Sequence, residues 1–192
     1  MDSDPDEGPR RRALPRSPHV HVESSRERLS GRVFDVWSER VRLPSGLVQD
    51  LDVVVHGGAV AVLPLHADGT VLLVRQYRHA VGDWLLEIPA GRLEEGEDPQ
   101  TAAARELEEE TGVRAATWTP LGALWPAPGF CSESLHLFLA RDLETVPGGG
   151  LAMDADEEIE RVRVPLDELA DRTDDAKSLV AAMRARRVLE AD

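Results

Sequence analysis

Short β-type runs of apolar residues, separated by polar and turn-forming residues, dominate the chain from Val33 onward and predict strands. Runs at 33–43 and 47–56 flank Pro44, Ser45 and Gly46, which suit a tight turn, so a β-hairpin is expected there. The same arrangement recurs around residues 67–69. The remaining strand-like runs lie at 58–65, 70–77, 84–88, 118–125, 134–140 and 158–164.

Helical patterning is confined to three segments, at 98–111, shortly after Pro165, and at 174–190. Many short strands with few helices between them favour an α+β fold with a mixed or antiparallel sheet over a doubly wound α/β fold. We expect a disordered tail at 1–20, because its apolar content is low, an N-terminal β region at 21–56, and the main domain with its C-terminal helix at 57–192.

The charge of the chain restricts its partners. Of 192 residues, 36 are acidic and 22 basic, giving a net charge of -14, which disfavours binding to nucleic acids or anionic membranes. Much of the acidity is concentrated in two stretches, at 94–110 and 142–175. With one cysteine, Cys131, and no apolar run long enough to span a membrane, a cytoplasmic protein is expected.

The first acidic stretch contains the helix predicted at 98–111. Asp98 suits an N-cap, Pro99 the first helical position, and Gly112 a left-handed end. At about 100° per residue, three glutamates share one sector and an apolar set lies beside it, whereas Glu108 points outward. The acidic sector comprises Glu106, Glu109 and Glu110, and the apolar one Ala103, Ala104, Leu107 and Thr111.

Three carboxylates on one helix face repel one another unless cations lie among them, and oxygen ligands favour Mg²⁺ or Mn²⁺. The alternative is an acidic face that is merely solvated. The spacing decides between these interpretations, because the stretch 91–113 (GRLEEGEDPQTAAARELEEETGV) resembles the Nudix box at every defined position. Those positions are Gly91, Glu97, Arg105, Glu106, Leu107, Glu109, Glu110, Gly112 and Val113.

This resemblance implies a Nudix α/β/α sandwich with a mixed sheet that hydrolyses a nucleoside diphosphate linked to another moiety. Two or three divalent cations would be bound by the side chains of Glu106, Glu109 and Glu110 and by the carbonyl of Ala90. Glu97 and Arg105 would form a pair that holds the loop against the helix. Gly91 and Gly112 would have structural roles.

The sequence around the box is similar to that of ADP-ribose pyrophosphatases. Pro128 lies 15 residues beyond the end of the box, as in their proline-containing signature, and 87–91 (EIPAG) and 76–79 (QYRH) precede the box. The N-terminal β extension, which packs against the partner subunit in that family, is a third similarity and implies a homodimer.

The resemblance also implies substrate contacts. Arg78 would contact the adenosine or phosphate end, Glu133 the ribose or phosphate region, and Trp37 would stack on adenine. Each residue has a structural alternative. A Trp in a strand is commonly a core or dimer-contact residue, and Arg78 could pair with an acidic neighbour.

The second acidic stretch includes residues 154–158, which resemble the loop that supplies a general base in these pyrophosphatases. Glu157 is the first candidate and Glu158 the second, while the helix glutamates, with Glu109 as catalytic candidate, could serve instead. The sequence therefore predicts metal-dependent hydrolysis of ADP-ribose to AMP and ribose 5-phosphate. The alternatives are another nucleoside diphosphate derivative (a nucleotide sugar, dinucleotide or flavin nucleotide) or a non-catalytic ADP-ribose sensor.

Overall fold

The computed structural model describes residues 14, 17–148 and 159–191, which divide into two compact units. The first unit contains the described residues up to Gly57 together with Ala127–Glu133. The second contains Gly58–Pro126 and the described chain from Ser134 onward. Most of the tail predicted at 1–20 lies outside the described residues. The sequence analysis separated an N-terminal β region at 21–56 from a main domain at 57–192. It did not predict that residues 127–133 belong to the first unit.

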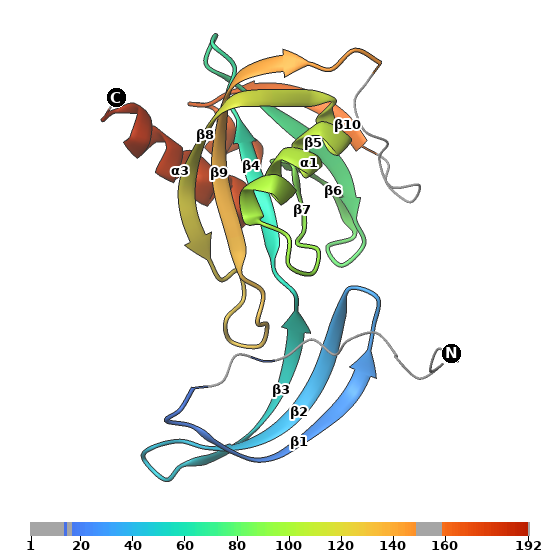
Figure 1. Ribbon diagram of the computed structural model, residues 1–192, viewed down its shortest axis with the longest axis vertical. Coiled ribbons are helices and arrows are strands. Elements are labelled where there is room, and N and C mark those ends of the chain that lie inside the picture. Colours follow the sequence, from blue (N-terminus) through green and yellow to red (C-terminus); the bar gives the residue numbers. More distant parts are fainter. Residues whose placement is uncertain (1–13, 15–16, 149–158, 192) are drawn as a thin grey trace, which may run out of the picture. The chain divides into compact units, whose positions relative to one another are not determined.

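The first unit is built on a three-stranded antiparallel sheet in the order β1-β2-β3 (Figure 1). Its strands are β1 (His21–Ser30), β2 (Phe34–Arg42) and β3 (Val48–His56). The segment 127–133 attaches to β3, where the Val54 N–H donates to the Phe130 carbonyl (2.7 Å) and the Ser132 N–H donates to the Val54 carbonyl (2.9 Å). The sequence pattern predicted the β2–β3 hairpin but missed β1 as a strand, because β1 is mostly polar and buries little of either face.

The second unit contains two sheets, ordered β7-β4-β9-β8 and β10-β5-β6. All strand pairs in these sheets are antiparallel except β4 with β9, which makes the larger sheet mixed, as expected. The elements are β4 (Ala59–Pro64), β5 (Thr70–Arg78), β6 (Asp83–Glu87), β7 (Ala90–Arg92), α1 (Pro99–Thr111), β8 (Val113–Leu124), β9 (Leu135–Thr145), β10 (Ile159–Pro165), α2 (Leu169–Arg172) and α3 (Ala176–Leu189).

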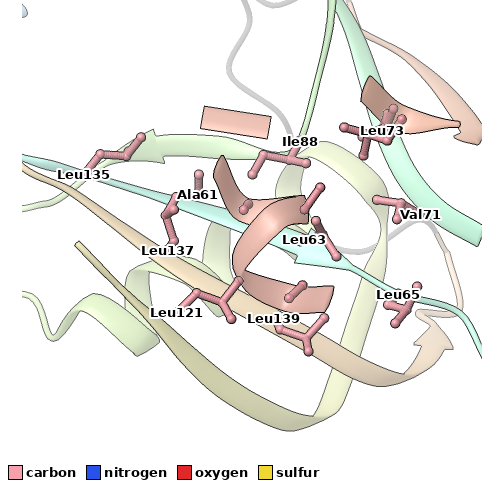
Figure 2. Packing of buried hydrophobic residues seen from close by; sticks show 14 of the residues in the cluster. Ala61, Leu63, Leu65, Val71, Leu73, Ile88, Leu121, Leu135, Leu137 and Leu139 are labelled. Atoms are coloured by element: carbon pink, nitrogen blue, oxygen red, sulfur yellow. The ribbon is translucent and has the colours of Figure 1, made fainter. Parts of the chain in front are cut away.

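Strand β4 is buried on both faces, so its side chains contribute alternately to two hydrophobic clusters. Val60 and Val62 pack with Ala102, Ala103 and Leu107 of α1. The other face of β4 joins the larger cluster, shown in Figure 2, which includes three buried alanines of α3. Helices α1 and α3 thus cover opposite faces of the mixed sheet (Figure 1), as in the predicted sandwich.

The large cluster reaches the segment that precedes β7, because Ile88 is fully buried in it together with Leu63, Leu73 and Leu137 (Figure 2). The sequence pattern gave no indication of β7, a strand of three residues that pairs with β4 at Ala59–Ala61. It also placed the start of β8 too late, at 118, although this strand begins directly after Gly112. Within the described part of the chain, no helix is long and apolar enough to cross a membrane.

Candidate active site

Helix α1 begins and ends with the caps that the sequence predicts. Oδ2 of Asp98 accepts hydrogen bonds from the N–H groups of Gln100 (3.1 Å) and Thr101 (3.0 Å), and Pro99 is the first helical residue. Gly112 ends the helix in the left-handed region (φ 64°), and its N–H donates to the Glu108 carbonyl (2.8 Å). The helix therefore has fixed ends, which set the positions of the side chains between them.

The buried face of α1 differs from the prediction at two positions. Ala102 is fully buried and Ala104 is exposed, so the apolar sector is rotated slightly from the predicted one. Glu108 points away from the other glutamates, but this outward position is covered, because only 7% of the residue is exposed. Arg114, at the start of β8, donates two hydrogen bonds to its carboxylate (2.6 and 2.9 Å), and this raises the pKa of Arg114.

Arg105 lies among three of the box carboxylates. Its Nε and Nη2 donate to the two oxygens of Glu97 (3.1 and 3.0 Å), which is the predicted pair between loop and helix. Its Nη1 donates to Glu106 Oε1 (2.7 Å) and Glu109 Oε2 (3.1 Å). These contacts, with the Glu97 pair first, raise the pKa of Arg105 above its usual value, while the hydrogen bonds from Arg105 lower the pKa of Glu97.

The carboxylate of Glu106 lies against the backbone of Gly91. A Cβ added to Gly91 would fall 1.9–2.2 Å from the carboxylate atoms of Glu106, so no larger residue fits without displacing that side chain. The box glycine therefore serves close approach rather than an unusual backbone angle. It brings the Glu106 carboxylate next to β7, whose first residue is Ala90.

Glu110 is almost completely buried, with 2% of the residue exposed. Its Oε2 accepts the Ala90 N–H (3.1 Å), and its backbone carbonyl accepts a hydrogen bond from Nε of Arg161 in β10 (3.0 Å). The side chain joins α1 to β7, and the main chain joins α1 to β10. The last turn of α1 is consequently tied to both sheets of the second unit.

The donor set of this helix face fits a hard divalent cation. Glu106, Glu109 and Glu110 provide carboxylate oxygens, of which those of Glu110 lie at the Ala90 N–H and those of Glu106 lie against Gly91. In the described residues, no three His, Cys, Asp or Glu side chains gather as closely as a metal-bound set would. Arg105 donates to Glu106 and Glu109 as well as to Glu97, so its single positive charge offsets only part of theirs.

Arg78, predicted to contact substrate, forms an ion pair within the protein. Its Nε and Nη2 donate to the two oxygens of Glu87 (2.8 and 2.7 Å), which is 2% exposed. Lys177 of α3 donates to the same carboxylate. Burial alone would raise the pKa of Glu87, but these two cations outweigh it and the pKa is lowered. The hydrogen bonds with Glu87 raise the pKa of Arg78, and the charge of Glu110 contributes to this shift.

The other predicted site residues lie elsewhere. Trp37 and Glu133 belong to the first unit, in which Trp37 is partly buried and Oε1 of Glu133 lies 3.9 Å from His56 Nδ1. Trp37 Nε1 is buried and has no hydrogen-bond partner among the described residues. Glu157 and Glu158 lie outside the described residues. Their role as a base therefore stays a prediction.

Sequence reasoning overlooked several residues that position the site, namely Glu87, Arg161, Lys177 and Ser178. Glu87 and Arg161 lie in predicted strands, but the partners that join them to other elements of the site, Lys177 and Glu110, are 90 and 51 residues away in sequence. One signal was available for Lys177, which is the only lysine of the chain. A single lysine among many arginines could have drawn attention to this position.

Comparisons with known proteins agree on one family. The chain matches the NUDIX domain over residues 55–183. It is 42% identical over 139 residues to the ADP-ribose pyrophosphatase of Bacillus subtilis, covering 72% of this chain and 75% of that protein. It is 37% identical over 157 residues to the methanol dehydrogenase activator of Bacillus methanolicus, covering 79% and 84% of the two chains.

A relative from Mycobacterium tuberculosis, also named an ADP-ribose pyrophosphatase, is 44% identical over 118 residues, or 61% of this chain and 57% of that protein. Among solved structures, the crystal structure of an ADP compounds hydrolase superimposes with a TM-score of 0.80. It covers 93% of this chain and 98% of that chain at 24% identity. At this identity the likeness concerns the fold, and it agrees with a mixed sheet between two helices.

Replacing Gly91 with Ala tests whether the position of Glu106 matters for cation binding. The added Cβ meets only the end of a flexible side chain, so the free energy of unfolding should change little while Glu106 is forced aside. We expect affinity for Mn²⁺, measured by calorimetric titration, to fall about 10- to 100-fold. Gly129→Ala, where a Cβ meets nothing within 4 Å, is the matched control. Unchanged Mn²⁺ affinity in Gly91→Ala would contradict the assignment of Glu106.

The pair between Glu97 and Arg105 predicts an acid-dependent loss of stability. Because the pKa of Glu97 is lowered in the folded state, its contribution is complete above the unfolded pKa of about 4.3. That contribution is lost as the pH falls through the lower, folded value. In chelator, Glu97→Gln should show a shallower decline of the free energy of unfolding from pH 5 to 3 than the wild type. Glu94→Gln, an exposed neighbour, should retain the wild-type slope. Equal slopes in all three proteins would rule out this role of the pair.

Proposed function

This chain belongs to the NUDIX domain family, and we propose that it hydrolyses the diphosphate of ADP-ribose to AMP and ribose 5-phosphate with divalent cations. The single observation that carries the proposal is the face of α1 on which Glu110 binds Ala90 and Glu106 lies against Gly91, with Glu109 held by Arg105 on the same helix. Two relatives that are 42% and 44% identical are named ADP-ribose pyrophosphatases, which supports the choice of substrate.

The three helix carboxylates and the carbonyl of Ala90 would hold two or three Mg²⁺ ions, or Mn²⁺ in their place. When bound, these cations neutralise the diphosphate, polarise its phosphorus–oxygen bonds and lower the pKa of a bound water. The protein's own part is to orient the ligands. Arg105 keeps the loop with Glu97 in place, and Gly91 leaves the space that Glu106 occupies.

A carboxylate of the acidic loop would act as general base. In this step a water oxygen attacks one phosphorus of the diphosphate, the bridging P–O bond on that phosphorus breaks, and Glu157 accepts the water proton. Glu158 is the second candidate, and Glu109 of the helix the third. One contact supports a loop base: β10 begins one residue after Glu158, and Arg161 of this strand is tied to the Glu110 carbonyl.

Substrate recognition is assigned to three residues. Arg78, which is held by Glu87, would contact the adenosine or phosphate end of the substrate through the part of its guanidinium that remains accessible. Trp37 would stack on adenine, and Glu133 would bind in the ribose or phosphate region.

We further propose a cytoplasmic homodimer, with the β region at 21–56 at the subunit contact. The three-stranded sheet of the first unit has several exposed large apolar side chains, which a second subunit would cover. These residues, which are 39–54% exposed, are Leu29, Phe34, Leu47 and Leu51.

Two alternatives differ in what the site does with its ligand. The chain could cleave another nucleoside diphosphate derivative, such as a nucleotide sugar, a dinucleotide or a flavin nucleotide, or it could bind ADP-ribose without turnover. The complete set of box glutamates favours an enzyme over a sensor. A panel of these compounds incubated with Mg²⁺, with products resolved by chromatography, tests the proposal. A much higher kcat/KM for another compound would refute the substrate, and binding without cleavage would support the sensor.

Two glutamate variants separate metal binding from proton transfer. Glu110→Gln removes a ligand charge, so both Mn²⁺ affinity and activity should fall by at least about 100-fold. Glu157→Gln should lower kcat about 10²- to 10⁴-fold while leaving Mn²⁺ affinity within about twofold of the wild type. The measurements are steady-state kinetics and calorimetric titration of Mn²⁺. Wild-type kcat in Glu157→Gln would exclude Glu157 as the base and move the role to Glu158 or Glu109.

A further inference from the structure

Thr173, just before α3, and the first turn of α3 bind three consecutive residues, 86–88, that lead into the candidate metal site. The Thr173 hydroxyl donates to the Leu86 carbonyl (2.5 Å), Lys177 donates to the Glu87 carboxylate, and the Ile88 N–H donates to the Ser178 hydroxyl (2.9 Å). Two residues after Ile88, the Ala90 N–H donates to Glu110. The turn of α3 therefore fixes the path of the chain from β6 to β7.

The contact with Glu87 differs from those with Leu86 and Ile88, because it involves charged groups. Glu87 accepts two hydrogen bonds from Arg78 and one from Lys177, and Nζ of Lys177 also donates to Oδ1 of Asp175 (3.0 Å). Glu87 is 2% exposed, and the side chains of Lys177 and Asp175 are 16% and 14% exposed. Two cations and two carboxylates thus form a compact, neutral network, in which Arg78 is the most exposed member. Asp175 is also the N-cap of α3.

Within this network Glu87 binds one edge of the Arg78 guanidinium and leaves the other edge available to a ligand. The Nε and Nη2 of Arg78 are used by Glu87, whereas Nη1 has no partner among the described residues. The side chain is 38% exposed. A guanidinium held in this way can present Nη1 to an anion without first losing conformational freedom, which favours binding of a phosphate.

We propose that Lys177 is a positioning residue for substrate binding, which acts through Glu87 to hold Arg78 toward the diphosphate. This role rests on the function proposed above. Removing the charge of Lys177 would leave the network with a net charge of -1 close to the already acidic helix face. An anionic substrate would then be disfavoured by charge, and Arg78 would share Glu87 with no second cation.

Kinetics of charge-removing and charge-retaining variants test this role. Lys177→Met should raise KM for ADP-ribose about tenfold or more and change kcat less than about twofold, because binding rather than chemistry is affected. Lys177→Arg should recover most of the lost affinity. Ser178→Ala is the comparison variant, since it disturbs the same turn of α3 without changing its charge. It should lower Tm and raise KM much less than Lys177→Met does.

Two kinetic outcomes would overturn the proposal. One is a KM in Lys177→Met that rises no more than in Ser178→Ala. The other is a KM in Lys177→Arg that rises as much as in Lys177→Met. The wild type is assayed first with ADP-ribose and the other compounds, so that an incorrect substrate proposal is recognised before the variants are compared. If another nucleoside diphosphate derivative is cleaved instead, the variants are compared on that compound.

A second measurement needs no catalysis. Because Lys177 is the only lysine, protein labelled with 13C-lysine gives a single ε-methylene resonance. Arg78→Met should shift this resonance, since both cations share the Glu87 carboxylate, whereas Arg75→Met, at an exposed ion pair with Glu160, should not. An unshifted resonance in Arg78→Met would refute the coupling between Arg78 and Lys177.

Discussion

The negative charge crowded on the second half of α1 is the constraint on which the rest of the second unit depends, because these carboxylates require partners from neighbouring elements. Four glutamates occupy five consecutive positions, 106–110, near the helix C-terminus, where the helix dipole also disfavours anions. Their carboxylates have partners in α1 itself, in β8 and in β7. Arg105 pairs with Glu106 and Glu109, Arg114 with Glu108, and the Ala90 N–H with Glu110. The charges on α1 therefore specify where β7 and β8 lie.

The segment from Glu87 to Gly91 connects this charged face to the core. Within it, Ile88 is buried in the large hydrophobic cluster, while Glu87 at one end binds Lys177 and Gly91 at the other end contacts Glu106. Apolar burial thus anchors a stretch whose polar groups carry the proposed chemistry. A site built on such an anchored segment is pre-organised, because its backbone is fixed by packing before any ligand binds.

Residue spacing predicted the parts of the structure that are local in sequence. The caps of α1, the pair between Glu97 and Arg105 and the mixed sheet all follow from short-range patterns and from the resemblance to a known motif. Contacts between different elements were not predictable in this way. Glu108 was expected only to point outward, because helical periodicity contains no information about β8, where Arg114 covers it. Strand β1 was missed because polar strands lack an apolar face to reveal them.

The junction at Gly112 limits how this protein can change. Helix α1 ends at Thr111 and β8 begins at Val113, so a single residue separates the helix that carries the glutamates from a strand paired with β9 along most of its length. An insertion or deletion here would rotate the carboxylates by about 100° per residue or slip the register of β8. This junction consequently does not tolerate insertions or deletions, and its sequence can diverge by substitution alone.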